Sequence, residues 1–225
     1  MSANEASKHP VRPRNAASLV IVRGVGDKAE VLMGRRRPKA SFIPDAFVFP
    51  GGRMDAQDML VEPSRPLSAD TLNLLKEKAQ CTASEARGLA TAAIRETYEE
   101  TGLWLAEPGD VGAQADGEWR EFRERRMAPA HDKLGYLGRA ITPPDSPIRF
   151  HARFFIADAD HIHGELGGSG ELLDLSWYRI DAALKLPIID VTEFMLGEVQ
   201  ARVSGRSKGA PFFSYRANKP LIRYL

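Results

Sequence analysis

The sequence predicts an α/β fold, and two observations lead to this prediction. Short runs rich in β-branched and aromatic residues are spread along the 225 residues and alternate with amphipathic helical segments. An alanine-rich segment over residues 84–101 has apolar residues at helical spacing. A chain of this length can bury a sizeable core. We therefore expect a flexible N-terminal arm over residues 1–15 and a single domain over residues 16–225.

The individual elements follow from local composition and turn residues. A Gly-Val-Gly-Asp turn at residues 24–27 predicts a hairpin between the first two strands. Residues 59–83 contain prolines and an N-cap signal at Ser68, and we interpret them as an inserted flap with one short helix. The expected strands are residues 16–23, 30–34, 47–49, 134–141, 149–157 and 173–179, and the expected helices are residues 71–79, 84–101, 117–127 and 192–203.

The end of the alanine-rich helix carries three carboxylates on one face, from Glu96, Glu99 and Glu100. Like charges one turn apart destabilise a helix, so this face favours a bound cation. Carboxylates without Cys or His favour Mg²⁺ or Mn²⁺ over Zn²⁺. The alternative is a solvated surface helix with surplus glutamates. Gly102 is suited to a left-handed C-terminal cap, and the opposite face should pack on the core through Ala90, Ile94, Thr97 and Thr101.

Two further stretches could contact a phosphorylated ligand. Arg35, Arg36 and Arg37 follow the second strand, and arginine donates paired hydrogen bonds to phosphate oxygens. A solvated strand end is the alternative. The strand at residues 47–49 ends in Pro-Gly-Gly, and glycines at 51 and 52 allow the backbone to approach a ligand closely.

Composition excludes several classes of function. Lys and Arg total 31 against 30 Asp and Glu, which gives no global charge signature for nucleic acid or an anionic membrane. The single cysteine, Cys81, fits a reducing compartment, and no apolar run is long enough to span a membrane. The N-terminus lacks an apolar signal core. We therefore expect a cytoplasmic protein, with the oligomeric state open and a homodimer as one option.

Together, the glycine turn and the acid helix resemble the Nudix box, Gly-x5-Glu-x7-Arg-Glu-U-x-Glu-Glu-x-Gly-U, where U is a bulky aliphatic residue. Its second half is matched by Arg95, Glu96, Glu99, Glu100, Gly102 and Leu103. In the first half Asp58 stands in the position of the first Glu after Gly52, and 36 residues (59–94) replace the seven of the motif. The insertion therefore lies inside the box. A split box resembles the branch of Nudix hydrolases that includes the animal peroxisomal coenzyme A diphosphatase.

The resemblance implies a Nudix fold, in which a mixed β-sheet lies between α-helices, and metal-dependent hydrolysis of a diphosphate bond in a nucleoside diphosphate derivative. Coenzyme A or acyl-coenzyme A is the preferred substrate, cleaved to adenosine 3′,5′-bisphosphate and (acyl-)4′-phosphopantetheine. ADP-ribose, a dinucleotide or an oxidised nucleotide is the enzymatic alternative. A nucleotide sensor that does not cleave its ligand is the alternative of another class.

The resemblance also implies roles for individual residues. Glu96, Glu99 and Glu100 would hold Mg²⁺ or Mn²⁺ with a backbone carbonyl of Gly51, and Arg95 would orient a carboxylate. Glu171 stands six residues before Trp177 and is the candidate extra ligand or general base, with Glu165 in reserve. The flap would lie near the site and cover the pantetheine arm. The expected substrate contacts are Arg35, Arg36, Arg37 and Phe49, and the expected outer metal ligands are Asp55 and Asp58.

Overall fold

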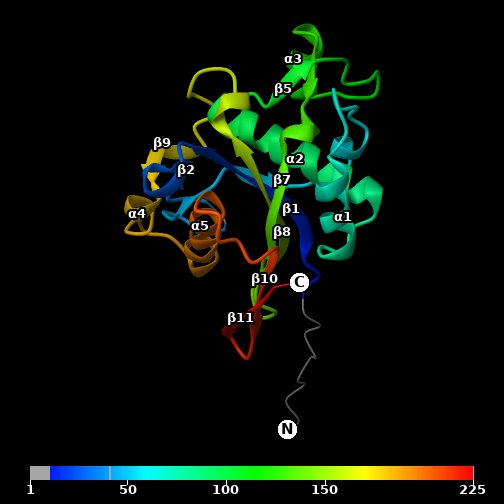
Figure 1. Ribbon diagram of the computed structural model, residues 1–225. Helices are drawn as coiled ribbons and strands as arrows, with labels where there is room; N and C mark the ends of the chain where they lie inside the picture. The colour runs from blue at the N-terminus through cyan, green and yellow to red at the C-terminus, as the bar shows by residue number, and fades with distance from the viewer. Residues whose placement is uncertain (1–10, 41, 225) are drawn as a thin grey trace.

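The computed structural model describes residues 11–40 and 42–224 (Figure 1). Most of the predicted arm, residues 1–10, lies outside the described residues. The first strand begins at Arg14 instead of residue 16, because Arg14 and Asn15 already pair with Phe150 and His151. The first strand therefore begins two residues earlier than predicted.

The strands form a mixed sheet, as the fold class requires. The described residues contain a nine-stranded sheet whose main path runs β11-β10-β7-β8-β1-β2-β3, with β4 paired to β1 and β9 paired to β2. The β1–β8 and β7–β10 pairs are parallel, and the other pairs are antiparallel. The strands are β1 Arg14–Arg23, β2 Glu30–Arg36, β3 Phe47–Val48, β4 Gly51–Arg53, β7 Gly135–Ile141, β8 Phe150–Asp158, β9 Leu172–Arg179, β10 Pro211–Arg216 and β11 Lys219–Tyr224.

Helices cover both faces of this sheet (Figure 1). One core cluster joins α2 to β1 side chains such as Leu19 and Ile21, and a second joins α5 to Val20 and Val22. Alternation along β1 therefore assigns the two helices to opposite faces. The helices are α1 Ala69–Glu77, α2 Ala83–Thr101, α3 Trp119–Glu124, α4 Ile180–Ala183 and α5 Asp190–Val203. None of the described helices is long and apolar enough to cross a membrane.

The acid-bearing helix α2 has well-defined ends. Thr82 and Glu85 form a capping box at its start, and Gly102 caps its end with a φ of 73°. The side predicted to pack on the core does so, since Ala90, Ile94 and Thr97 are fully buried. The sequence prediction for this helix is confirmed within one residue.

The predicted charged helix over residues 117–127 was too long. Helix α3 ends at Glu124, and β6 (Met127–Pro129) then pairs with β5 (Ala106–Pro108) in a small separate sheet. Backbone pairing with a distant segment is not visible in the local composition, which is why the helical pattern was extended too far.

The inserted segment over residues 59–83 packs on the α2 side of the sheet. Leu75 and Ala79 belong to the same core cluster as the buried face of α2, and the Thr71 hydroxyl donates a 2.9 Å hydrogen bond to the Leu134 carbonyl. The cleft described below opens on the α5 side and none of its lining residues belongs to 59–83, so this segment does not cover that cleft.

Candidate active site

Gly51 and Gly52, predicted as part of a turn, are the first residues of β4 and bring the backbone against the acids of α2. The Gly51 amide donates a 2.8 Å hydrogen bond to Oε2 of Glu100. A Cβ atom on Gly52 would lie 2.4–2.5 Å from the carboxyl atoms of Glu96, too close for any side chain. Glycine at 52 therefore makes room for the Glu96 carboxylate between β4 and α2.

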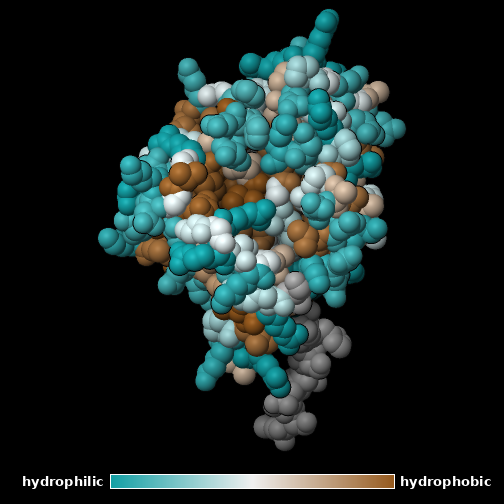
Figure 2. Space-filling view, viewed as in Figure 1, coloured by the Kyte–Doolittle hydropathy of each residue, from teal (hydrophilic) through white to brown (hydrophobic). Residues whose placement is uncertain are grey.

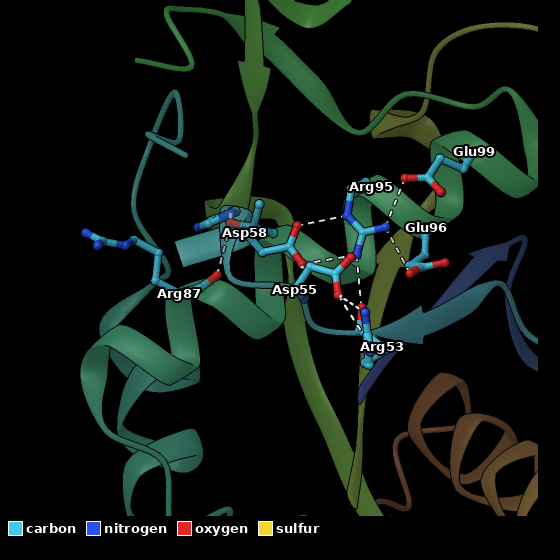
Figure 3. A network of polar contacts seen from close by, with 9 residues as sticks. Arg53, Asp55, Asp58, Arg87, Arg95, Glu96 and Glu99 are labelled. Atoms are coloured by element: carbon cyan, nitrogen blue, oxygen red, sulfur yellow. Dashed lines mark hydrogen bonds and ion pairs between the residues drawn. The ribbon is translucent and has the colours of Figure 1, made fainter. Parts of the chain in front are cut away.

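Arg95 holds the neighbouring acids in place (Figure 3). Its Nη1 donates 2.9 Å hydrogen bonds to Glu96 and Glu99. Its Nε and Nη2 donate to the two oxygens of Asp58 at 2.9 and 3.0 Å, and Nη2 also donates to the Arg53 carbonyl. The expectation that Arg95 orients a carboxylate is consistent with this network, which links three elements.

The structure contradicts the prediction that Asp58 is an outer metal ligand. Its carboxylate is fully buried, and its two oxygens accept hydrogen bonds from Arg95 and from the Asp55 amide. Charge-assisted pairing of this kind leaves Asp58 as the anchor of Arg95. Asp55 pairs through its own side chain with Arg53 at an exposed position and does not line the cleft. It is therefore not placed as a metal ligand either.

Burial disfavours the ionised form of the three glutamates of α2. It raises the pKa of Glu96 to about 7 and that of Glu100 to about 8, and it also raises the pKa of Glu99. Arg95 opposes the shifts at Glu96 and Glu99, while the like charge of Glu96 adds to that at Glu100. A positive charge placed among these oxygens would restore their ionised form.

The donor chemistry of this cluster fits a hard divalent cation, which prefers carboxylate and carbonyl oxygens. Over residues 11–40 and 42–224 no three His, Cys, Asp or Glu side chains stand together as a ready metal site. Figure 3 shows that Arg95 donates to oxygens of Glu96 and Glu99. The residues that would hold the cation are nevertheless one turn apart on the same helix.

A cleft of about 590 Å³ opens beside this cluster, on the α5 side of the sheet. Figure 2 shows one face of the molecule, largely hydrophilic, with hydrophobic side chains gathered in a central hollow. One part of the cleft is lined by Glu96, Glu100, Gly51 and Gly52. The remaining wall is mostly apolar and includes Phe42, Ile43, Val48, Phe49, Ile141, Ile148, Phe150, Phe154 and Val191. Phe49, an expected substrate contact, is therefore in the wall, whereas Glu99 is not.

Of the three consecutive arginines, Arg36 lines the cleft and the other two do not. Arg35 donates to Asp174 at 2.7 Å and to Asp45 at 3.0 Å, and Arg37 donates to the Gly170 carbonyl. Arg35 and Arg36 are successive residues of β2 and point to opposite sides of the strand, and Arg37 follows its end. The structure therefore brings only Arg36 of the three to the cleft, and Arg35 and Arg37 lie outside its lining.

The glycine-rich loop before β9 packs on the end of α2. The amides of Gly167 and Ser169 donate to the carbonyls of Thr101 and Glu99 at 2.8 and 2.7 Å. These bonds bring Glu171 to the cleft, where its charge raises the pKa of Glu100. The reserve candidate Glu165 is not among the lining residues.

The cleft contains residues that sequence reasoning missed. Arg14 lines it from β1, and Asp190 and Tyr215 line it from α5 and β10. The Tyr215 hydroxyl donates to Asp190 at 2.7 Å. No local motif marks these positions, since they meet only when β10 pairs with β7 and lies beside α5.

Comparison with known proteins extends these observations. No family model matches the chain. The acyl-coenzyme A diphosphatase NUDT19 of Xenopus laevis is 32% identical over 205 residues, which cover 69% of this chain and 54% of that protein. The same enzyme of Gallus gallus is 27% identical over 157 residues, covering 57% of this chain and 41% of that protein. The chain therefore spans about half the length of these curated relatives.

Solved structures show the same architecture over nearly the whole chain. A Nudix hydrolase from Alicyclobacillus acidocaldarius has a TM-score of 0.67 and 28% identity, covering 88% of this chain and 99% of its own. The Nudix domain of Shewanella oneidensis NrtR, solved with ADP ribose, has a TM-score of 0.50 and 12% identity over 89% of this chain and 94% of its own. With the box residues in place on α2, the chain belongs to the Nudix hydrolase superfamily and resembles its coenzyme A diphosphatases.

Proposed function

We propose that this protein is a metal-dependent diphosphatase that cleaves the diphosphate bond of coenzyme A or an acyl-coenzyme A. One observation carries the proposal: Glu96 and Glu100 meet Gly51 and Gly52 of β4 at one part of a cleft whose other walls are mostly apolar. An acidic part suits a metal-bound diphosphate, and an apolar wall suits a pantetheine or acyl arm. The acyl-coenzyme A diphosphatases among its relatives support this choice of substrate.

We assign a role in catalysis or positioning to each residue of the cluster. Glu96 and Glu100, with Glu99 beside them, would hold the cation through carboxylate oxygens. A bound Mg²⁺ or Mn²⁺ would neutralise the diphosphate and lower the pKa of the attacking water. Glu171 lines the cleft near Glu100, and we propose that its carboxylate accepts a proton from that water. Arg95 keeps Glu96 and Glu99 oriented while Asp58 fixes Arg95.

We propose that Arg36 binds a phosphate group of the substrate. It lines the cleft, and its Nε is buried without a hydrogen-bond partner among the described residues. A buried donor of this kind is satisfied when a phosphate oxygen accepts from it. The 3′-phosphate of coenzyme A would supply such an oxygen, whereas ADP-ribose lacks this group. We also propose a cytoplasmic location and leave the homodimer as an option for the active form.

The proposal is tested by identifying products by mass spectrometry. The purified protein is incubated with coenzyme A, acetyl-coenzyme A or ADP-ribose in the presence of Mg²⁺ or Mn²⁺, beside an EDTA control. Release of 4′-phosphopantetheine that depends on metal is the expected result. Faster cleavage of ADP-ribose would move the assignment to the enzymatic alternative.

Two variants separate catalysis from binding. Glu100→Gln should keep the fold and lower kcat by about 10²–10³-fold, because it removes one charged ligand. Glu124→Gln, at an exposed position of α3, is the matched control and should leave kcat unchanged. Ligand binding without cleavage by the wild-type protein would favour the sensor instead.

A further inference from the structure

The face of the sheet turned away from the cleft carries a pair of buried arginines. Arg139 on β7 and Arg153 on β8 stand directly opposite each other in the antiparallel register, and they are 5% and 4% exposed. Their neighbours Ala140 and Ala152 line the cleft, so the arginines point to the other face. Like charges directly opposite each other destabilise a strand pair, and burial adds a desolvation cost to each.

No carboxylate pairs with these two arginines within the part of the chain that the structure describes. Arg153 donates instead to the Asn15 amide oxygen at 2.7 Å and to the His151 carbonyl at 2.9 Å. Glu85 is close enough for Arg153 to lower its pKa, but its carboxylate accepts hydrogen bonds from the Thr82 cap. Glu85 therefore offsets part of the positive charge from a distance, and no carboxylate forms an ion pair with either arginine within the described residues.

Their other neighbours add no negative charge. Arg139 lies 3.9 Å from the ring centroid of Phe212 and 3.2 Å from Nε2 of His151. Burial and the two arginines lower the pKa of His151 to about 3, so this ring is neutral at pH 7. Cys81 is buried beside them, and burial raises the pKa of its thiol, which keeps it protonated as well.

Three buried donors in this region remain unused, and they lie close enough for the charges of both arginines to oppose the rise that burial causes in the pKa of Tyr136. Over residues 11–40 and 42–224, neither Nε of Arg139, nor Nε of Arg153, nor the hydroxyl of Tyr136 has a hydrogen-bond partner. Tyr136 is 2% exposed and pairs with Phe155, two residues along β8 from Arg153 on the same face. Buried polar groups are almost always satisfied, so unused donors of one kind indicate an acceptor that binds among them.

We propose that Arg139, Arg153 and Tyr136 form a binding site for one small anion, with chloride as the physiological occupant. An anion accepts from all the free donors and offsets the remaining positive charge, whereas a water molecule would bring two more donors into the same place. The site also touches the inserted segment, because Nη2 of Arg153 donates to the Ala79 carbonyl at 3.3 Å. Arg153 thus joins the end of this segment to the proposed site.

Thermal unfolding with bromide as the probe tests the site. The full chain in sodium gluconate is titrated with sodium bromide at constant ionic strength, and the unfolding midpoint should rise and saturate. Tyr136→Phe should raise the half-saturating bromide concentration about tenfold, since it removes one hydrogen bond to a charged partner. Arg179→Met, at an exposed position of β9, is the control and should respond like the wild type. A midpoint that never saturates, or an unchanged Tyr136→Phe response, overturns the proposal.

Anomalous diffraction from crystals grown in bromide gives the direct readout. A bromide peak within hydrogen-bond distance of Arg139 Nε, Arg153 Nε and the Tyr136 hydroxyl is expected, and it should vanish in Arg153→Met. An ordered water at that position, or a peak that persists in Arg153→Met, contradicts the assignment. Because the cleft lies on the other face, neither readout depends on whether coenzyme A is the substrate.

Discussion

At the scale of single residues, Asp58 and Asp55 make a matched pair for testing how Arg95 is held. Asp58 is fully buried and accepts two hydrogen bonds from Arg95, whereas Asp55 is exposed and pairs with Arg53. Asp58→Asn should lower the free energy of unfolding by about 3 kcal/mol, because it leaves a buried guanidinium short of its counter-charge. Asp55→Asn should change it by less than about 1 kcal/mol.

Urea denaturation monitored by circular dichroism measures both variants. Asp58→Asn should also reduce turnover, since Arg95 would shift toward the oxygens of Glu96 and Glu99 that are proposed to bind the cation. Equal stability losses in the two variants would show that burial of the Asp58 pair has no special weight.

The same residues show what the sequence could and could not predict. The spacing of Glu96, Glu99, Glu100 and Gly102 predicted the acid face and the helix end because both depend on residues within two turns. The partner of Arg95 lies 37 positions away, beyond the inserted segment, so spacing alone made Asp58 look like a metal ligand. The three arginines at 35–37 were grouped by charge because the predicted strand ended at residue 34, whereas β2 continues to Arg36 and turns Arg35 and Arg36 to opposite sides.

At the scale of elements, the surroundings of two glycines predict opposite effects of substitution by alanine. A Cβ on Gly52 would meet the Glu96 carboxylate at 2.4 Å, whereas nothing lies within 4 Å of a Cβ on Gly197 in α5. Gly52→Ala should therefore displace Glu96 and lower kcat by about 10²-fold. Gly197→Ala should raise the free energy of unfolding by about 0.5–1 kcal/mol without changing kcat, because alanine favours the helix.

Steady-state kinetics and urea denaturation of the two variants check this prediction together. If Gly52→Ala keeps wild-type kcat, then the position of Glu96 against β4 is not required for turnover, and the assignment of Glu96 to the metal fails with it.

At the scale of the whole molecule, the position of the inserted segment could not be predicted. Composition identified residues 59–83 as an insertion with one helix, and α1 confirms that helix. Its placement depends on which surface its apolar side packs against. Leu75 packs in the core cluster beside α2, on the face away from the cleft. The mixed sheet between helices was predicted, whereas the choice of face is decided by packing between segments far apart in the chain.

Stability should depend on pH in a way that combines both sides of the sheet. In the metal-free protein the folded pKa of Glu96 and Glu100 is raised to about 7 and 8, so their stabilising contribution is present at low pH and is lost as pH rises through those values. His131 and His151 act in the opposite sense. Their folded pKa is lowered to about 3, and stability is lost as pH falls below the ordinary histidine value of 6.5.

Between pH 6.5 and 8 the histidines are largely neutral in both states, and the two glutamates should dominate among these four groups. The free energy of unfolding of the metal-free protein should then fall as pH rises, by at most about 1.4 kcal/mol per pH unit for each group. Adding Mg²⁺ at pH 8 should recover stability, because the cation binds the ionised carboxylates of the folded state. Glu100→Gln should reduce this fall in the free energy of unfolding and weaken the stabilisation by Mg²⁺. Glu124→Gln should leave both effects unchanged. Urea denaturation at fixed ionic strength measures these differences. If the free energy of unfolding of the wild-type protein in EDTA does not change between pH 6.5 and 8, then the two acids are not held in the buried, repelling arrangement on which the metal assignment depends.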